Sequence, residues 1–332
     1  MEKTEREVIE WTNTWWAEAN TDARRGLLIG DSTTRQLRGS VERFLNNVYA
    51  IDLFAASFSI YDRRLEDHID MLFKYGDYKY DFIVLNYGGH HGFSKRCSES
   101  TEVYQTYSEK YTKLLKYLLS KCDKVICATG TSEVLDSDVN TIDPDIECEI
   151  IARNQIVLDA AYANHVEVFD LYGLMKRNRD IYTYRDRQHF YGEANCFISY
   201  NLLLDMLSKN IISKELIDMQ HIQGINRLIK YARWDKKYLI YGAGVVGKEL
   251  YWMLKWYGIE EKISCFVATH RMNNSRIVQK EIKILSELAR EELENSILVI
   301  ASDKYADEMN QMAINSQIKN VIFYRDLIDC LI

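Results

Sequence analysis

Three side chains have the types and positions needed for nucleophilic catalysis: Ser32, Asp186 and His189. A serine hydroxyl is a weak nucleophile until a base takes its proton, and histidine is a common base. The spacing Asp186-x-x-His189 lets one turn bring the carboxylate against the imidazole, which fixes the tautomer and stabilises the imidazolium. Alone, the serine could be a helix cap and the other pair a solvated ion pair. Within one domain, their combination predicts acyl transfer through a serine.

The elements that must position these residues indicate an α/β domain. Short runs rich in branched apolar residues alternate with helical patterns, which is typical of parallel strands covered by helices. Ser32 follows the first strand and opens a helix, at the edge where open α/β sheets bind ligands. Backbone N–H groups at that helix start would stabilise an anionic intermediate. The predicted strands are 26–29, 48–53, 82–86, 125–128 and 166–170, and the predicted helices include 37–45, 111–119 and 194–207.

These motifs resemble those of the SGNH hydrolases, also called the GDSL esterase and lipase family, over roughly residues 20 to 210. Leu28-Ile29-Gly30-Asp31-Ser32 is similar to the family's first block, and Asp186-x-x-His189 is similar to its last. The resemblance implies a flavodoxin-like three-layer sandwich. It also implies that Ser32 is the nucleophile, His189 the general base and then acid, and Asp186 the orienting carboxylate.

The family takes its oxyanion hole from the serine N–H, a glycine after the second strand and an asparagine after the third. Here the third strand runs into an Asn-x-Gly-x-His sequence, similar to a variant of some branches. The resemblance implies that Asn86 is the side-chain donor, with the Gly88 N–H or His90 as alternatives. The segment after the second strand has no glycine, so Ser57 or a backbone N–H would substitute.

A second motif follows a predicted strand near the C-terminus, where Gly242, Gly244 and Gly247 form G-x-G-x-x-G and open a helix. Such a turn offers free N–H groups to a phosphate. Glu249 stands where a P-loop needs Ser or Thr, which argues against a nucleoside triphosphatase. Ala268 stands where a dinucleotide site places its ribose-binding acid, which disfavours an oxidoreductase. A nucleotide or nucleotide sugar is the expected ligand, and tight helix–strand packing alone is the alternative.

The region around this turn contains a second α/β series. Its predicted strands are 238–241, 263–267, 297–300 and 321–323, with helices at 248–257 and 285–293. It looks like the Rossmann-like domains of nucleotide-sugar and polysaccharide-biosynthesis proteins. We therefore predict an SGNH-hydrolase-like domain over 1–210, a helical connector over 211–236 and a Rossmann-like domain over 237–332.

The composition of the chain argues against several classes of protein. The 332 residues carry a net charge of -7 with no basic block, so sequence-independent nucleic-acid binding has no electrostatic basis. The start of the chain is charged, and no apolar run approaches the ~18 residues of a membrane span. Seven scattered cysteines, none in a CxxC pair, predict a reducing cytoplasm and no metal site.

Together these features predict a cytoplasmic SGNH/GDSL-type serine esterase or O-acyltransferase. The expected substrate is an ester, acetyl in the first instance, of a carbohydrate in surface polysaccharide biosynthesis. Hydrolysis would need no cofactor, and the sequence leaves homo-oligomerisation open. The alternative is a catalytically degenerate SGNH domain in a nucleotide-sugar-binding or regulatory protein.

Overall fold

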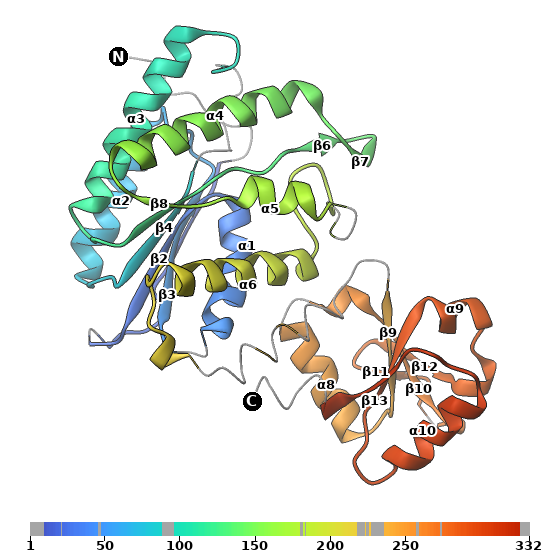
Figure 1. Ribbon diagram of the computed structural model, residues 1–332. Coiled ribbons are helices and arrows are strands. Elements are labelled where there is room, and N and C mark those ends of the chain that lie inside the picture. The colour runs from blue at the N-terminus through green and yellow to red at the C-terminus, as the bar shows by residue number, and fades with distance from the viewer. Residues whose placement is uncertain are drawn as a thin grey trace. The chain divides into compact units, whose positions relative to one another are not determined.

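The computed structural model describes residues 10–20, 22–45, 48–87, 96–179, 182, 184–217, 223, 226, 236–256, 259–272 and 274–325. Contacts divide the chain into two compact units, residues 1–190 with 198–217 and residues 191–197 with 218–332. The predicted domain boundaries stay predictions, because most of the proposed connector lies outside the described residues. Figure 1 shows both units, which we describe one at a time.

The first unit is built on a six-stranded sheet of order β1-β3-β2-β4-β5-β8. All neighbouring strands are parallel except β1, which pairs antiparallel with β3. Numbered along the chain, the parallel strands stand in the flavodoxin-like order 2-1-3-4-5. The predicted α/β class with a parallel-rich sheet is thus confirmed for this unit. The strands are β1 (Thr12–Trp15), β2 (Arg25–Gly30), β3 (Ala50–Ala56), β4 (Phe82–Asn86), β5 (Val125–Ala128) and β8 (Glu167–Phe169).

Every residue of β2 and β4 is buried, as expected for central parallel strands covered on both faces. One face packs against α2 (Arg63–Gly76), α3 (Thr101–Leu119) and α4 (Pro144–Ala163) through one continuous apolar cluster. The opposite face carries α1 (Ser32–Phe44) and α6 (Gly192–Ser208), as Figure 1 shows.

Local sequence signals set the starts of these helices. Asp31, Asp62, Ser100 and Asp143 each accept backbone N–H bonds at a helix N-terminus. Pro144 occupies the first turn of α4, where its missing N–H costs nothing. These caps fix where each helix leaves the carboxyl edge of the sheet, so they also fix the side chains that stand there.

Several short elements of this unit escaped sequence prediction. Strand β1 is short and carries the exposed Trp15, so it lacks the apolar run of a buried strand. After β5 the chain forms a small hairpin of β6 (Val134–Leu135) and β7 (Asp138–Ile142), and a short helix α5 (Leu171–Arg177) follows β8. A 3-10 turn at Lys214–Leu216, η1, follows α6.

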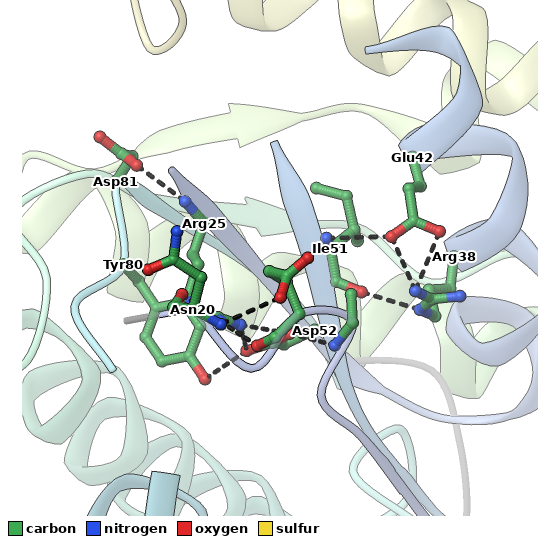
Figure 2. Close-up of polar contacts among 10 residues, drawn as sticks. Asn20, Arg25, Arg38, Glu42, Ile51, Asp52, Tyr80 and Asp81 are labelled. Atoms are coloured by element: carbon green, nitrogen blue, oxygen red, sulfur yellow. Dashed lines mark hydrogen bonds and ion pairs between the residues drawn. The ribbon is translucent and has the colours of Figure 1, made fainter. Parts of the chain in front are cut away.

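A buried ion pair closes the amino end of the sheet, opposite the end that carries Ser32. Arg25 on β2 and Asp52 on β3 both have fully buried side chains, and Arg25 Nη1 lies 3.0 Å from Asp52 Oδ2. The Tyr80 hydroxyl donates to the same carboxylate at 3.0 Å, and the Ala17 N–H donates to it at 2.8 Å. Figure 2 shows this network, in which Arg25 also reaches the Asn20 carbonyl. These bonds offset part of the cost of burying the two charges, although the buried Nε of Arg25 has no hydrogen-bond partner among the described residues.

The second unit holds another six-stranded sheet, of order β11-β12-β10-β9-β13-β14. Five strands are parallel neighbours, and β11 pairs antiparallel with β12. Numbered along the chain, the five parallel strands stand in the order 3-2-1-4-5. The strands are β9 (Lys237–Tyr241), β10 (Ile263–Ala268), β11 (Arg276–Ile277), β12 (Lys280–Ile284), β13 (Ser296–Ile300) and β14 (Val321–Phe323).

The helices that the structure describes in this unit include α8 (Val245–Trp256), α9 (Arg290–Glu294) and α10 (Ala306–Asn315), with 3-10 turns η2 (Glu260–Lys262) and η3 (Leu285–Glu287). The prediction of one helix over 285–293 is wrong, because η3 and α9 are separate and strand β12 directly precedes them. Strand β12 contains two lysines and one glutamate beside two isoleucines, and this half-exposed pattern hides the strand signal. Within the described ranges of both units, no helix is long and apolar enough to cross a membrane.

Candidate active site

Ser32 is the first residue of helix α1, directly beyond the end of β2. Its side chain is largely buried, with 7% of the residue exposed. Two residues earlier, Gly30 has no room for a side chain, because a Cβ there would lie 2.5 Å from the Asn86 carbonyl oxygen. The glycine therefore lets β2 and β4 end close together, which brings Ser32 and Asn86 to the same point of the sheet edge.

The amino end of α1 leaves one N–H for a ligand. Asp31 caps the helix, and its carboxylate accepts the N–H of Thr33 at 2.9 Å and that of Thr34 at 3.4 Å. No hydrogen bond among the described residues uses the N–H of Ser32. This group points into the positive end of the helix dipole, where an oxyanion formed on Ser32 would be stabilised.

The loop before α6 brings the other two predicted residues to the serine. His189 Nε2 lies 2.8 Å from Ser32 Oγ, although 157 positions separate the two residues. On the other side of the ring, His189 Nδ1 lies 2.9 Å and 3.1 Å from the two carboxylate oxygens of Asp186. The three residues thus form a continuous hydrogen-bonded chain from carboxylate to imidazole to hydroxyl, as nucleophilic catalysis by serine requires.

The Asp186 carboxylate is held by its own turn. It accepts the N–H of Gln188 at 3.0 Å and that of His189 at 2.9 Å. Partial burial acts to raise its pKa, but these donors and the nearby imidazole outweigh burial and hold the pKa of Asp186 below the usual value. Asp186 is therefore ionised at neutral pH and can stabilise a protonated His189.

A second carboxylate, that of Asp31, also faces this imidazole. Burial raises the pKa of Asp31 to about 6, although its bonds to Thr34 and Thr33 and the charge of His189 act in the opposite direction. Above that pH, Asp31 carries a negative charge with little water around it. This charge lies close enough to His189 to interact with the imidazole electrostatically.

The loop that carries Asp186 and His189 is anchored by Glu133, which sequence reasoning missed. This buried glutamate accepts Arg187 Nε at 2.9 Å and Gln188 Nε2 at 2.9 Å, on the two residues just before His189. The Val134 N–H also donates to the Arg187 carbonyl at 3.0 Å. Glu133 lies more than 50 residues from its partners, so spacing in the sequence gives no signal of this role.

Ser32 and Asn86 line one pocket of about 20 Å³, in which a group hardly larger than a water molecule fits. Its walls are mostly polar, and Leu171 is the one large apolar side chain among the described residues that line it. The loop after β5, which was not predicted to take part, forms one wall, and Asn154 holds it through two hydrogen bonds with Gly130. The full lining is Asp31, Ser32, Thr33, Asn86, Gly130, Thr131, Ser132, Glu133, Leu171 and Gln188.

The other predicted oxyanion residues are not brought to this pocket by the described part of the chain. The Ser57 N–H donates to the Trp11 carbonyl at 3.0 Å, and its hydroxyl accepts the Trp11 N–H at 2.9 Å, so β1 uses these groups. Gly88 and His90 lie outside the described residues. Asn86 is therefore the predicted side-chain donor whose position beside Ser32 can be described.

The three glycines of the second motif have different surroundings. Gly242 has φ of +124°, and a Cβ there would lie 2.6 Å from the Ala301 carbonyl oxygen. A Cβ on Gly247 would lie 1.8 Å from the Gly242 carbonyl oxygen, so close packing of α8 on β9 requires this glycine. A Cβ on Gly244 would meet nothing within 4 Å. Packing therefore explains two of the glycines and leaves the middle one open to a ligand.

Comparisons with known proteins find similarity only to solved structures. No protein-family model and no curated protein matches the chain. A lipase/acylhydrolase from Enterococcus faecalis aligns with 18% identity over 56% of this chain and 96% of its own, with a TM-score of 0.41. An acetyl xylan esterase aligns with 18% identity over 55% and 100%, with a TM-score of 0.40. A variant of an acetyl xylan esterase from Geobacillus stearothermophilus aligns with 10% identity over 57% and 97%, with a TM-score of 0.42. Scores this low assign no function, so the chemistry must come from the geometry of the site.

Proposed function

We propose that the protein is a serine esterase or O-acyltransferase of the SGNH type. The observation that carries the proposal is the chain of contacts from Asp186 through His189 to Ser32, with distances of 2.9 Å and 2.8 Å. Surface ion pairs and helix caps explain the separate pieces, but they do not explain an imidazole bonded to a carboxylate and to a buried hydroxyl at a sheet edge.

The proposed reaction has two steps. His189 Nε2 takes the proton of Ser32 Oγ as Oγ bonds to the ester carbonyl carbon. When the tetrahedral intermediate collapses, the bond to the alcohol oxygen breaks and the imidazolium returns its proton to that oxygen. Water or a sugar hydroxyl then attacks the acyl-serine, and His189 passes the proton of the attacking group back to Ser32. Asp186 keeps His189 oriented throughout.

Two donors would bind the negative oxygen of the intermediate. The Ser32 N–H stands at the start of α1, and Asn86 lines the same pocket from the end of β4. Donors fixed before the reaction need no rearrangement when the charge develops, which is why such groups lower the barrier.

The pocket favours a small acyl group. Its mostly polar lining and small enclosed volume favour a short acyl group such as acetyl over a long fatty chain. Sugars present many hydroxyls to such walls, so an acetylated carbohydrate is the proposed substrate, with a role in cytoplasmic surface-polysaccharide biosynthesis. Hydrolysis and transfer share the acyl-serine and differ only in whether water or a sugar hydroxyl attacks it.

For the second unit we propose a Rossmann-like domain that binds a nucleotide or a nucleotide sugar. Its strand order 3-2-1-4-5 and the glycine turn after β9 support this proposal. The open space at Gly244 lets a phosphate approach the backbone. Ala268, at the end of β10, supplies no carboxylate for a ribose, so binding without hydride transfer is proposed.

A catalytically degenerate SGNH domain is the second candidate, and the position of Ser57 favours it. The family takes an oxyanion donor from this segment, whereas here both groups of Ser57 are bonded to Trp11. Such a protein would bind a nucleotide sugar in its second unit and act as a regulator.

One experiment separates the two candidates. A fluorophosphonate probe reacts only with an activated serine, so incubation followed by peptide mapping should find the label on Ser32. His189→Ala should abolish labelling while circular dichroism stays unchanged. An unlabelled wild-type protein would favour the degenerate domain.

A further inference from the structure

Five arginines in the described part of the chain lie over an aromatic ring: Arg25, Arg35, Arg38, Arg64 and Arg153. Four of them also contact a carboxylate. Arg35 is the exception, since no carboxylate of a described residue lies within ion-pair distance of it.

Arg38, one turn further along α1, provides a direct comparison. Arg35 lies 4.5 Å above the ring of Trp11, and Arg38 lies 4.8 Å above the ring of Trp15. Arg38 Nη2 is 2.8 Å from Glu42, and its Nε donates to the Ile51 carbonyl at 2.7 Å, as Figure 2 shows. Both arginines stack on tryptophans around β1, but only Arg38 has its charge and its donors satisfied.

Arg35 is also the nearer of the two to the proposed nucleophile. It follows Ser32 by three positions on α1, a spacing that places two side chains on the same face about 5–6 Å apart at their Cβ atoms. Trp11 is held at the same edge of the sheet by its backbone bonds to Ser57, the residue after β3. The exposed Arg35 therefore shares with Ser32 the first turn of α1, at the carboxyl edge of the sheet.

A stacked arginine of this kind is suited to binding anions. Stacking on Trp11 holds the guanidinium plane in one orientation, so less conformational freedom is lost when a ligand binds. Its donors match two oxygens of a carboxylate or phosphate at once. Half-buried Trp11 covers one face of the plane, and the N–H groups around its edge stay available.

We propose that Arg35, supported by Trp11, is a subsite for a carboxylate or phosphate group on the alcohol part of the ester substrate. This inference rests on the proposed esterase function and adds a charge preference to it. The acyl pocket beside Ser32 is small and polar, so the subsite accounts for recognition of the group that leaves. An acidic sugar and a phosphorylated sugar share this chemistry.

The test compares charged and neutral acetate esters that are otherwise alike. The substrates are 4-acetoxybenzoate, its methyl ester and 4-acetoxyphenyl phosphate. Arg35→Gln should lower kcat/KM about tenfold for one or both anionic esters and change it less than twofold for the methyl ester. Arg35→Lys should recover part of the loss. Arg38→Gln removes the same charge one turn away and serves as the control, with no selective loss expected.

The outcomes separate this inference from the proposed function. Equal losses for charged and neutral esters in Arg35→Gln, or no loss for either anion, would overturn the subsite and leave the esterase standing. If the wild-type protein hydrolyses none of the esters, the esterase fails, and an NMR titration with 4-hydroxybenzoate then tests the subsite without catalysis. Indole N–H shifts that occur in the wild type and vanish in Arg35→Gln support the subsite, and their persistence in the variant rejects it.

Discussion

The two glycine-containing turns have similar backbone geometry but differ in the side chains that surround them. In each unit a central parallel strand, β2 or β9, ends in a turn that opens a helix, and a Cβ on a glycine of the turn would strike a backbone carbonyl. The first turn carries Ser32, which receives His189 from 157 residues away. The second turn offers backbone N–H groups followed by the apolar Val245. The backbone N–H groups of a single turn can bind a phosphate. Activation of a hydroxyl also needs side chains from distant parts of the sequence.

The largest effect on activity should come from removing Ser32 or His189, which have no counterpart at the described part of the second turn. We expect Ser32→Ala and His189→Ala each to lower kcat for an aryl acetate by about 10⁴- to 10⁶-fold, because the two groups act as one unit. Asp186→Asn should cost as much or less, since its side chain is 46% exposed and water can take over part of its role. Steady-state kinetics, with thermal melting as the folding control, checks this. Full activity in Ser32→Ala would remove the esterase assignment.

The next effect tests whether the site also needs a donor from a neighbouring strand. Asn86→Ala should lower kcat by about 10²- to 10³-fold with KM nearly unchanged, because an oxyanion donor acts mainly in the transition state. Asn86→Asp, which keeps the shape but removes the N–H donors, should behave similarly. If Asn86→Ala is silent while His90→Ala is not, the donor lies in the following loop.

The buried carboxylate of Asp31 should make the free energy of unfolding depend on pH. Asp31 binds its proton more tightly in the folded protein, so its contribution to stability is fully present below the unfolded pKa of 3.8 and is lost as the pH rises through about 6. The difference corresponds to about 3 kcal/mol. Asp31→Asn keeps a good helix cap, so it should flatten this dependence, raise Tm at pH 7 and lower kcat. Urea melts between pH 4 and 7 measure the effect, and an unchanged slope in the variant would refute it.

Substitutions of the glycines in the second turn should have different effects on ligand binding and on stability. A nucleotide or nucleotide sugar at 100 times its Kd should stabilise the protein by about 2.7 kcal/mol in a thermal-shift assay. Gly244→Val should keep the fold and lose this shift, because its side chain would fill the open space that a phosphate needs. Gly247→Ala should instead lower Tm without any ligand. A shift retained in Gly244→Val would contradict the proposed site, and hydride transfer from NADH would show that Ala268 does not exclude redox chemistry.

The smallest effect concerns how the loop of the first site is held. Glu133→Gln should lower kcat about tenfold, since the amide lacks the negative charge and keeps only one of the two acceptor oxygens that hold Arg187 and Gln188. KM and the yield of fluorophosphonate labelling at long times should not change. Asp136→Asn is the matched control, because Asp136 is exposed and touches only the far end of Arg187. Equal effects of the two changes would argue against positioning by Glu133.

Sequence patterns captured the parts of the molecule that local chemistry determines. The five parallel strands of the first unit, the Gly30 turn and the Asp186-x-x-His189 turn each have a signal within a few residues. Strand β1 and the β6–β7 hairpin were missed because short exposed strands carry no apolar run. The role of Glu133 and the occupation of Ser57 by Trp11 depend on contacts across 54 and 46 residues, which spacing cannot reveal.

The buried Arg25–Asp52 pair has a consequence for how β3 finds its place during folding. In the native register Asp52 lies opposite Leu27, two positions beyond Arg25 on β2. A slip of one residue would turn Asp52 to the other face of the sheet, where the carboxylate would be buried without its arginine. The pair therefore penalises a misaligned sheet more than it strengthens the native one. Since the same register aligns Gly30 with Ala55, a charge at one end of the strands selects the alignment on which the serine turn at the other end depends.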